Sequence, residues 1–491
     1  MSIPGINDVG PATDTSTPIA SAATRIIVPA GNEWRIEVPF RKQMTVTVLE
    51  GVAEVFGTEL APKVEYKFSG VKYAIYAPLE SVTLEYTVSN SPELHRMALG
   101  DDDVVEYLSN ETTMNQVTNL ALYLETLRQK AHDGNARGAL PRLRGPRVLV
   151  LGPHGAGKTA VAKTLVLYAV KMGLTPVLVN LNPRDGVFSV PGSLTATTIN
   201  DSLDIEAAGG WGFTPTLGSL PHNPKQPLVK NFGFSAMGDN RELYNYQTLK
   251  LGVAVMLRLE HDPRTASAGV VIDTPPDLGG NNLSLLFATI ENIISDFEVD
   301  HLVVIGNERL FVDLKHKLKR KIDLKLLTTI KLPRSGGSVD VDDLFVRQAQ
   351  EELIREYFNG NSRAHLQPLK TDIDGAALDV YKGVEASDLL LSLAFLPLGD
   401  DYSNDLEPAD SLDKYYRKLE TADLQKVENT LVAISHVPQL SYKPKDVLNT
   451  SVKGYIYVAK VDNQKLKVLL PFPAALLPKN VMLATGIGYT E

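Results

Sequence analysis

One stretch of the sequence, residues 148–172, combines an apolar strand, a glycine-rich loop and an amphipathic helix. Within it, Gly152, Gly157, Lys158 and Thr159 satisfy the phosphate-loop pattern of glycine, four arbitrary residues, glycine, lysine, and serine or threonine. Glycines let backbone N–H groups turn toward phosphate oxygens, and the following helix adds the positive end of its dipole. The stretch therefore predicts a nucleotide-binding α/β domain, with an ordinary glycine turn as the alternative.

The loop residues and one distant aspartate form the candidate site. Lys158 is placed to span the β- and γ-phosphates of a nucleotide, and the Thr159 hydroxyl is placed to ligate magnesium. Asp273 ends the apolar strand VVID, where a second magnesium ligand is expected and a turn residue is the alternative. The predicted nucleotide-binding residues of the loop are Gly152, Pro153, His154, Gly155, Ala156, Gly157, Lys158, Thr159 and Ala160.

Apolar strands alternate with helical periodicity after this loop. Strands are expected in TPVLVNL, AGVVI and HLVVI, and helices over residues 283–297 and 308–318. This alternation is typical of a mostly parallel sheet with right-handed crossovers, the layout of a P-loop NTPase domain. Residues 207–227 are rich in glycine and proline, so we expect a surface insertion there.

The flanking regions show other patterns. Between residues 24 and 90, short alternating segments such as EWRIEV, AEVFGTEL and KYAIYAP predict an antiparallel β-sandwich. Helical periodicity follows over residues 115–131, and GYIYVAKV with KLKVLLP predicts a β-pair near the C-terminus. The expected division is a flexible tail (1–24), a sandwich (25–114), a helix and linker (115–146), a P-loop domain (147–360) and a small C-terminal α+β domain (361–491).

Composition excludes several classes of function. The 491 residues include no cysteine, which excludes disulfides, thiolate metal sites and a cysteine nucleophile. No apolar run approaches the ~20 residues of a membrane span, and the net charge of −9 opposes unspecific attraction of nucleic acid. Two basic stretches are either solvated surface or local patches for RNA, and the second is alternatively a nuclear-import signal. They comprise Arg137, Arg142, Arg144 and Arg147 in the first and residues 315–321 in the second.

Several stretches also carry a resemblance to a known family. The resemblance rests on EVFGTEL, GPHGAGKTAVAKTL, VNLNPRDGVFSVPGS, NERLFVDLK, and KLPRSGGS followed by IREYFNG. In this order they resemble the polynucleotide 5′-hydroxyl kinase family, and within it the ATP-binding subunit of pre-mRNA cleavage factor IA. The resemblance spans residues 33–360 and implies a nuclear protein with a β-sandwich, a P-loop domain and a small C-terminal domain. It also implies ATP and Mg²⁺ as ligands. The implied partners are the cleavage factor subunit that contacts the RNA polymerase II C-terminal domain, and other cleavage and polyadenylation subunits.

Two residues of the first domain are assigned by the resemblance alone. In that family an acidic and a basic residue of the sandwich reach the adenine, and the matching positions are Glu33 in GNEWRIEV and Lys72 in GVKYAIY. The residues by themselves predict solvent-facing strand charges at both positions.

The chain departs from the active-kinase pattern at the strand after the phosphate-loop helix. Active relatives read Leu-Asp-Val-Gly-Gln-Gly there, with a catalytic aspartate, whereas this chain has Asn182 at that position and Asp185 three residues later. An amide carries no charge and cannot act as a general base. Catalysis is therefore not expected from Asn182.

Two further departures concern the acceptor and the lid. Active relatives have a tryptophan that clasps the RNA end where this chain has Asp277, so stacking worth about 1 to 3 kcal/mol per base is lost. The lid after Ser335 contains Asp340, Asp342 and Asp343 and leaves only Arg347 as a candidate cation, although one lid arginine can contribute ~10³ or more in rate.

These departures predict an ATP-binding scaffold of the 3′-end processing machinery with no catalytic residue and weak or no direct RNA binding. The alternative is an active ATP-dependent RNA 5′-hydroxyl kinase in which Asp185 or Asp273 replaces the missing aspartate. A signalling GTPase is disfavoured because no Asn-Lys-x-Asp motif follows a central strand.

Overall fold

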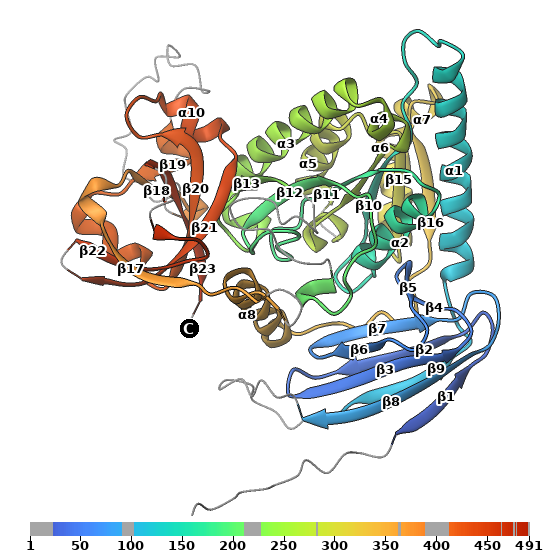
Figure 1. Cartoon of the computed structure of the whole chain (residues 1–491). Coiled ribbons are helices and arrows are strands. Elements are labelled where there is room, and N and C mark those ends of the chain that lie inside the picture. The colour runs from blue at the N-terminus through green and yellow to red at the C-terminus, as the bar shows by residue number, and fades with distance from the viewer. Residues whose placement is uncertain are drawn as a thin grey trace, which may run out of the picture.

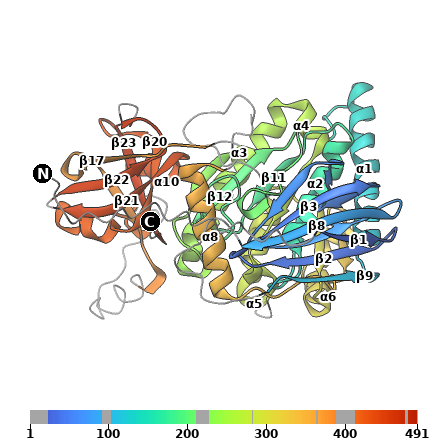
Figure 2. The same ribbon diagram turned by 60° about the horizontal axis from the view of Figure 1, so that its bottom comes forward.

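The computed structural model describes residues 23–90, 103–210, 227–280, 283–361, 365–387, 412–462, 464–474, 477 and 479–489. The described chain forms an N-terminal β-sandwich, a central α/β body and a C-terminal mixed sheet (Figure 1). The sandwich lies against one end of the central body, and the C-terminal sheet lies against its side (Figures 1 and 2). Of the predicted tail, Thr24 already begins the first strand, and residues 1–22 lie outside the described part.

Two antiparallel sheets form the sandwich, as predicted. Their strand orders are β1-β8-β3-β6 and β5-β4-β7-β2-β9. Side chains alternate along β3 between buried and partly exposed positions, because one face of each sheet covers the shared core. The strands are β1 (Thr24–Val28), β2 (Glu33–Val38), β3 (Lys42–Glu50), β4 (Ala53–Val55), β5 (Thr58–Leu60), β6 (Glu65–Phe68), β7 (Val71–Tyr76), β8 (Val82–Asn90) and β9 (Val105–Ser109).

Two details of the sandwich differ from the sequence pattern. AEVFGTEL forms a hairpin of β4 and β5 instead of one alternating segment, because Phe56 and Gly57 both adopt positive φ, at 48° and 92°, and reverse the chain. Strand β9, which pairs with β2, was not predicted, because its side chains are mostly exposed and show no apolar alternation.

A seven-stranded, mostly parallel sheet organises the central body, and its order is β13-β12-β11-β14-β10-β15-β16. Strands β11, β14, β10, β15 and β16 are mutually parallel, whereas β12 pairs antiparallel with both of its neighbours. The predicted central strands are therefore confirmed, and β12, β13 and β16 are additions. The strands are β10 (Arg147–Leu151), β11 (Val177–Asn180), β12 (Ser193–Thr198), β13 (Leu228–Asn231), β14 (Val270–Asp273), β15 (His301–Ile305) and β16 (Thr328–Leu332).

Helices cover both faces of this sheet. Val148 and Val150 of β10 pack in one cluster with α1 and α2, while Leu149 and Leu151 pack with α3, α5 and α6 on the other face. Burial on both faces explains why the central strands are uninterrupted apolar runs. The helices are α1 (Met114–Ala136), α2 (Lys158–Lys171), α3 (Arg241–His261), α4 (Pro263–Ala268), α5 (Leu283–Asp296), α6 (Glu308–Lys317), α7 (Lys319–Asp323) and α8 (Asp343–Asn359).

The expected surface insertion is partly wrong. Ala207 and Gly210 are buried, and residues 208–210 form the short 3₁₀ helix η1 (Ala208–Gly210) beside α8. Residues 211–226 lie outside the described part of the chain. The first residues of the glycine-rich region are therefore a packed segment and not a surface loop.

The C-terminal body contains a second seven-stranded sheet, with the order β17-β22-β21-β20-β23-β18-β19, and its described residues include the α-helix α10 (Pro444–Asn449). The predicted pairing of GYIYVAKV with KLKVLLP is confirmed as the antiparallel pair β21–β22. The sheet shares a continuous apolar core with the central body. Its strands are β17 (Leu369–Asp374), β18 (Val380–Gly383), β19 (Tyr416–Lys418), β20 (Thr430–Pro438), β21 (Val452–Asp462), β22 (Lys465–Leu470) and β23 (Asn480–Gly488).

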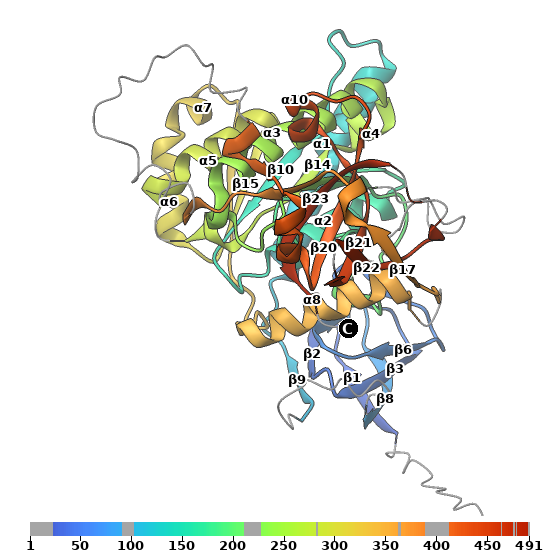
Figure 3. The ribbon, with the colours of Figure 1, turned by 90° about the vertical axis from the view of Figure 1, so that its left-hand side faces the viewer.

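Helix α8 connects these bodies in space. In Figure 3 it lies between the sandwich below and the central and C-terminal bodies above. In the chain it follows β16 of the central sheet and precedes β17 of the C-terminal sheet. Among the described residues, no helix combines the length and the apolar character that a membrane span requires.

Candidate nucleotide-binding site

The phosphate loop lies between β10 and α2, at the carboxyl edge of the parallel sheet. Gly155 and Gly157 adopt positive φ, 62° and 84°, a region that side chains rarely tolerate, and α2 begins directly afterwards at Lys158. The curled backbone and the first turn of the helix therefore direct N–H groups toward the space above the loop. This geometry fits a phosphate chain.

The Lys158 amine folds back onto its own loop. It donates hydrogen bonds to the carbonyl oxygens of Gly152 and Pro153, each at 3.0 Å. Burial lowers the pKa of Lys158, and the nearby charges of Asp273 and Asp185 counteract that shift. A buried ammonium with only carbonyl partners is suited to exchange them for phosphate oxygens.

The two predicted magnesium ligands lie together. The Thr159 hydroxyl donates a hydrogen bond to Oδ2 of Asp273 at 2.6 Å, while Oδ1 accepts one from the backbone of Thr274 at 2.9 Å. Burial raises the pKa of Asp273, and the Thr159 hydrogen bond lowers it. Within the described residues no cluster of three or more His or acidic side chains could hold a metal alone. This pair would therefore need phosphate oxygens and water to complete a magnesium shell.

Asn182 lies on the same edge of the sheet, in the turn after β11. Its side-chain oxygen accepts a hydrogen bond from the backbone of Arg184 at 3.3 Å, so the amide stabilises the turn. Asp185, three residues later, is partly buried within the electrostatic reach of Asp273 and Lys158. Burial and the charge of Asp273 raise the pKa of Asp185 to about 6, whereas a hydrogen bond from Asn182 lowers it. The displaced aspartate thus belongs to the charged cluster of the site.

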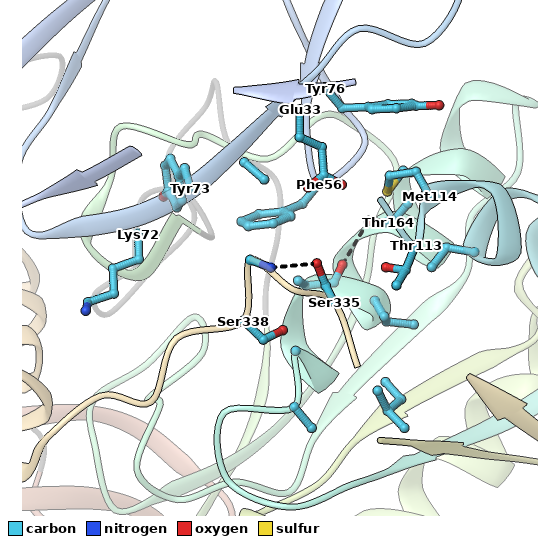
Figure 4. A pocket seen from close by; sticks show the side chains of 18 of the residues that line it. Glu33, Phe56, Lys72, Tyr73, Tyr76, Thr113, Met114, Thr164, Ser335 and Ser338 are labelled. Atoms are coloured by element: carbon cyan, nitrogen blue, oxygen red, sulfur yellow. Dashed lines mark hydrogen bonds between the residues drawn. The ribbon is translucent and has the colours of Figure 1, made fainter. Parts of the chain in front are cut away.

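A cavity of about 290 Å³ continues from the phosphate loop to the N-terminal sandwich (Figure 4). Its floor includes the loop residues Gly155, Ala156 and Gly157 and the first turns of α2. The sandwich, α1 and the lid residues between Pro333 and Val341 contribute the other walls, so the cavity requires both the central body and the sandwich. The lining residues from the sandwich and α1 include Glu33, Phe56, Lys72, Tyr73, Met114 and Val117.

Glu33 and Lys72 both line this cavity but differ in environment. Glu33 is only 4% exposed, so the expectation of a solvent-facing strand charge is wrong for it. Its carboxylate accepts hydrogen bonds from Arg35, at 2.9 Å, and from the Thr112 hydroxyl. Lys72 is partly exposed, points away from Glu33 in Figure 4, and donates to Glu37 at 2.8 Å.

The lid differs from its expected arrangement. Arg347 lies on α8, where its exposed guanidinium pairs with Glu351 at 3.2 Å and not with the phosphate loop. Arg334, which precedes the lid, contacts Asp340 at 2.8 Å and the Ser338 carbonyl at 3.2 Å. A Cβ added to Gly155 would overlap Oδ1 of Asp340 and lie 3.2 Å from Arg334 Nη2. Arg334 and Asp340, and not Arg347, therefore cover the loop.

Asp277 follows β14 in the short 3₁₀ helix η3 (Pro276–Gly279). Its charge acts on Lys158, which places it on the phosphate side of the site. A carboxylate at this position offers no stacking surface to a base.

The first basic stretch is partly neutralised by acidic neighbours. Arg144 pairs with Glu298 at 2.7 Å, and Arg147 pairs with Asp300 at 3.0 Å. In the second stretch, Leu314 and Leu318 beside the cations are buried in the helix packing, while the cations from Lys315 to Arg320 are exposed. Neither stretch lines the nucleotide cavity.

Several residues of the site could not be found from sequence. Arg35 and Phe56 lie on sandwich strands or turns without a local motif, and Tyr73 and Met114 resemble ordinary core residues. Lys163 gave one usable signal, because in the sequence this cation interrupts the mostly apolar run of residues 160–170. Arg334 had a second signal, since it follows the carboxyl end of an edge strand, where ligands of α/β sheets bind.

Comparisons with known proteins agree with this geometry. A family model described as mRNA cleavage and polyadenylation factor CLP1 P-loop matches residues 152–360. A model of the N-terminal beta-sandwich domain of polyadenylation factor matches residues 27–131, and one described as pre-mRNA cleavage complex II protein Clp1 matches residues 366–491.

Curated relatives and solved structures extend the similarity over almost the whole chain. The mRNA cleavage and polyadenylation factor CLP1 of Debaryomyces hansenii is 48% identical over 94% of both chains, and that of Candida albicans is 46% identical over 100% of both. The structure of a wild-type Clp1p–Pcf11p complex matches with a TM-score of 0.78 and 27% identity, covering 96% of this chain and 100% of that one. A second structure, with the same values, describes an extended Pcf11p–Clp1p interface and the basis for ATP loss in a point mutant. The chain belongs to the family of the mRNA cleavage and polyadenylation factor CLP1.

Proposed function

We propose that this chain is an ATP-binding, catalytically silent scaffold subunit of the nuclear pre-mRNA 3′-end cleavage and polyadenylation machinery. The observation that carries the proposal is the cavity walled jointly by the phosphate loop and the sandwich. A ligand held there contacts both bodies, so its binding energy stabilises their contact. The ATP loss described for a point mutant of a related Clp1p supports ATP as that ligand.

The residues present fit magnesium-bound ATP. Lys158 and the N–H groups at the start of α2 would bind the phosphates, and Thr159 with Asp273 would hold Mg²⁺. Magnesium would neutralise charge between the β- and γ-phosphates. Glu33, whose carboxylate lines the cavity on the sandwich side, would accept a hydrogen bond from the adenine amino group.

Three features of the site support silence toward RNA. Asn182 replaces a charged base with a neutral amide that the turn already uses. Asp277 supplies a carboxylate where a base would have to stack. Arg334 is paired with Asp340, so its charge is partly compensated before any phosphoryl group could use it.

The competing function is an active RNA 5′-hydroxyl kinase, and one observation favours it. Asp185 lies in the charged cluster with Lys158 and Asp273, and its pKa is raised to about 6. A carboxylate with that pKa is suited to act as a general base near neutral pH.

Nucleotide analysis and an RNA kinase assay separate the two functions. The protein is purified without added nucleotide, its bound ligand is identified by chromatography, and γ-labelled ATP is offered with 5′-hydroxyl RNA. The scaffold proposal expects intact ATP and unlabelled RNA. RNA labelling that is lost in both Lys158→Ala and Asp185→Asn would overturn the proposal and assign the base to Asp185.

Removal of the ligand gives an independent check. A ligand present at a thousandfold excess over its Kd stabilises the folded form by about 4 kcal/mol. We therefore expect EDTA and nucleotide removal to lower the melting temperature, and readdition of ATP with Mg²⁺ to restore it. An unchanged melting curve would contradict a structural role of ATP.

We further propose a partner equivalent to Pcf11p, the protein with which the related Clp1p was solved. In the wider assembly this partner would contact the RNA polymerase II C-terminal domain, and the chain would bridge it to other cleavage and polyadenylation subunits. Co-expression of the chain with its Pcf11p counterpart should yield a complex that survives gel filtration. Separate elution of the two proteins at micromolar concentration would contradict the proposal.

A further inference from the structure

A short segment, Leu203–Gly210, connects the sandwich to the central body and is called the bridging segment below. In its first half, Ile205 and Glu206 are bound to the sandwich, whereas the side chain of Leu203 packs in the core of the central body. The Tyr73 hydroxyl donates to the carbonyl of Ile205 at 2.9 Å, and the backbone of Lys67 donates to Glu206 at 2.8 Å. The side chain of Ile205 packs inside the hydrophobic core of the sandwich. Movement of the sandwich must therefore displace this half of the segment.

The second half of the bridging segment is bound by two helices of the central body. The Lys163 amine, on α2, donates to the carbonyl of Gly209 at 2.7 Å. On the other side, Glu356 of α8 accepts a hydrogen bond from the backbone of Ala208 at 2.7 Å. Sandwich, phosphate-loop helix and α8 thus hold one stretch of eight residues from three directions.

The packing around Gly210 leaves no free space. A Cβ added to Gly210 would overlap the Tyr73 hydroxyl and lie 3.1 Å from the Lys163 amine. The sandwich side chain and the central-body side chain therefore meet directly at this residue. Lys163 is only 6% exposed, so its contact is protected from water.

Lys163 lies close to the nucleotide site without lining it. It follows Lys158 by five residues on the same helix, and the charges of Asp185 and Asp273 reach its amine. The cavity is lined instead by its neighbours Val161 and Thr164, so Lys163 does not contact a ligand held there. Lys163 can therefore act on that ligand through the bridging segment and the sandwich, besides the charge that it adds near Asp185 and Asp273.

We propose that Lys163 is a positioning residue that holds the sandwich closed over the nucleotide cavity through the bridging segment, and thereby sets how long the nucleotide stays bound. The inference rests on the proposed ATP-binding function. The two bodies share the cavity walls, so their separation removes the contacts on one side of a bound nucleotide. A second contact, in which Glu54 of the sandwich is bonded by Tyr168 and by Lys171 at 2.9 Å, anchors the far end of α2.

The test compares two buried lysines with the same chemistry. Lys163→Met removes the amine from the bridging segment. Lys230→Met removes an equally buried amine that donates to the carbonyls of Asn449 and Thr450, at 2.6 and 3.0 Å, on the opposite, C-terminal side. The readout is the dissociation rate of fluorescent methylanthraniloyl-ATP with Mg²⁺, measured after a chase with excess ATP.

The two variants should differ in the dissociation rate of the nucleotide analogue. We expect dissociation about tenfold faster in Lys163→Met, the change that corresponds to the loss of one charge-assisted hydrogen bond, and within about twofold of wild type in Lys230→Met. Equal rates in the two variants would overturn the inference. Absence of analogue binding to the wild-type protein would instead contradict the proposed function itself.

A second readout follows the position of the sandwich directly. The chain has no cysteine, so the exposed residues Leu79 and Val312 can be labelled through Leu79→Cys and Val312→Cys without further changes. Spin–spin distances between them should be narrowly distributed in the ATP-bound protein and broad when Lys163→Met is added. A narrow distribution in the presence of Lys163→Met would refute the closing role even if the variant is less stable.

Discussion

Glu33 is a buried carboxylate on the sandwich side of the cavity. Its carboxylate is buried and already bonded to Arg35 and Thr112, so its position is fixed before a ligand arrives. Lys72, the other predicted adenine contact, is partly exposed and bonded to Glu37 instead. Base recognition should therefore depend more on Glu33 than on Lys72.

The first prediction concerns base preference. In Glu33→Gln the charge that Arg35 faces is removed, and a hydrogen-bond acceptor for the adenine amino group is weakened. We expect ATP affinity to fall about tenfold and the preference for ATP over GTP to decrease. Calorimetric titration with both nucleotides measures this. Glu85→Gln, which removes an exposed partner of Arg25 on the same sandwich, should change neither, and equal loss in both variants would contradict the assignment.

Single residues were predictable where a local motif determines their role. The conformation of the phosphate loop and the proximity of Thr159 to Asp273 were predictable, because spacing along the chain and the end of a strand define these positions. The burial of Glu33, the Arg334–Asp340 pair and the Lys163 contact each depend on residues far away in sequence. No periodicity within one element could reveal those partners.

At the scale of elements, the loop after β10 is supported from outside by η3. Gly279 of η3 packs against the backbone of Gly152, and an added Cβ would overlap the Gly152 carbonyl and lie 2.6 Å from Pro153 N. The same carbonyl accepts a hydrogen bond from the Lys158 amine at 3.0 Å. The position of the phosphate loop therefore depends on a glycine that lies outside its motif.

The second prediction tests this support. Gly279→Ala should displace the phosphate loop, since its Cβ meets backbone and not a flexible side chain, at a cost of about 1 to 3 kcal/mol. We expect at least a tenfold loss of ATP affinity and a lower melting temperature. Gly238→Ala is the control, because a Cβ there would meet nothing within 4 Å. ATP affinity in Gly279→Ala equal to that of Gly238→Ala would show that the loop does not need η3.

Two of the strands that sequence patterns missed, β12 and β13, share a physical reason. Strand β12 reads SLTATT and β13 reads LVKN, so neither shows the apolar run of the neighbouring parallel strands. Both pair at the sheet edge with antiparallel partners and receive their burial from α3 and the C-terminal sheet. Their strand conformation is thus determined by tertiary packing, which local propensity cannot report.

At the scale of the whole molecule, the central body has two different interfaces. Toward the C-terminal sheet, Phe232, Tyr244 and Tyr357 share one apolar core with Tyr416 and Tyr455. Toward the sandwich, the cores are separate clusters, and contact combines the polar bonds of Glu54 and the bridging segment with smaller apolar contacts such as that of Ile205. A continuous apolar core favours a permanent union, whereas polar contacts around a ligand cavity allow the ligand to govern closure.

The last prediction uses the two buried lysines that lie at these interfaces. Burial lowers the pKa of Lys163 to about 7 and that of Lys230 to about 8. Asp185 and Asp273 counteract the shift at Lys163, whereas Lys250 adds to the shift at Lys230. The unfolded chain keeps each proton up to the ordinary lysine pKa near 10.4, so between the two pKa values it binds one more proton than the folded protein. The contribution of each lysine to stability therefore rises with pH, by up to about 1.4 kcal/mol per pH unit.

Melting temperatures of the nucleotide-free protein should show which of the two lysines begins to lose its proton at the lower pH. From pH 7 to pH 9, we expect wild type to become progressively more stable relative to Lys163→Met, beginning near pH 7. Relative to Lys230→Met, the same gain should begin about one pH unit higher, because the folded pKa of Lys230 is higher. Saturating ATP with Mg²⁺ adds negative charge near Lys163 and favours its protonated form. The rise in stability relative to Lys163→Met should therefore begin at higher pH, whereas the rise relative to Lys230→Met should begin at the same pH as before. If the stability of wild type relative to Lys163→Met depends on pH in the same way with and without nucleotide, the Lys163 amine lies outside the electrostatic reach of the site.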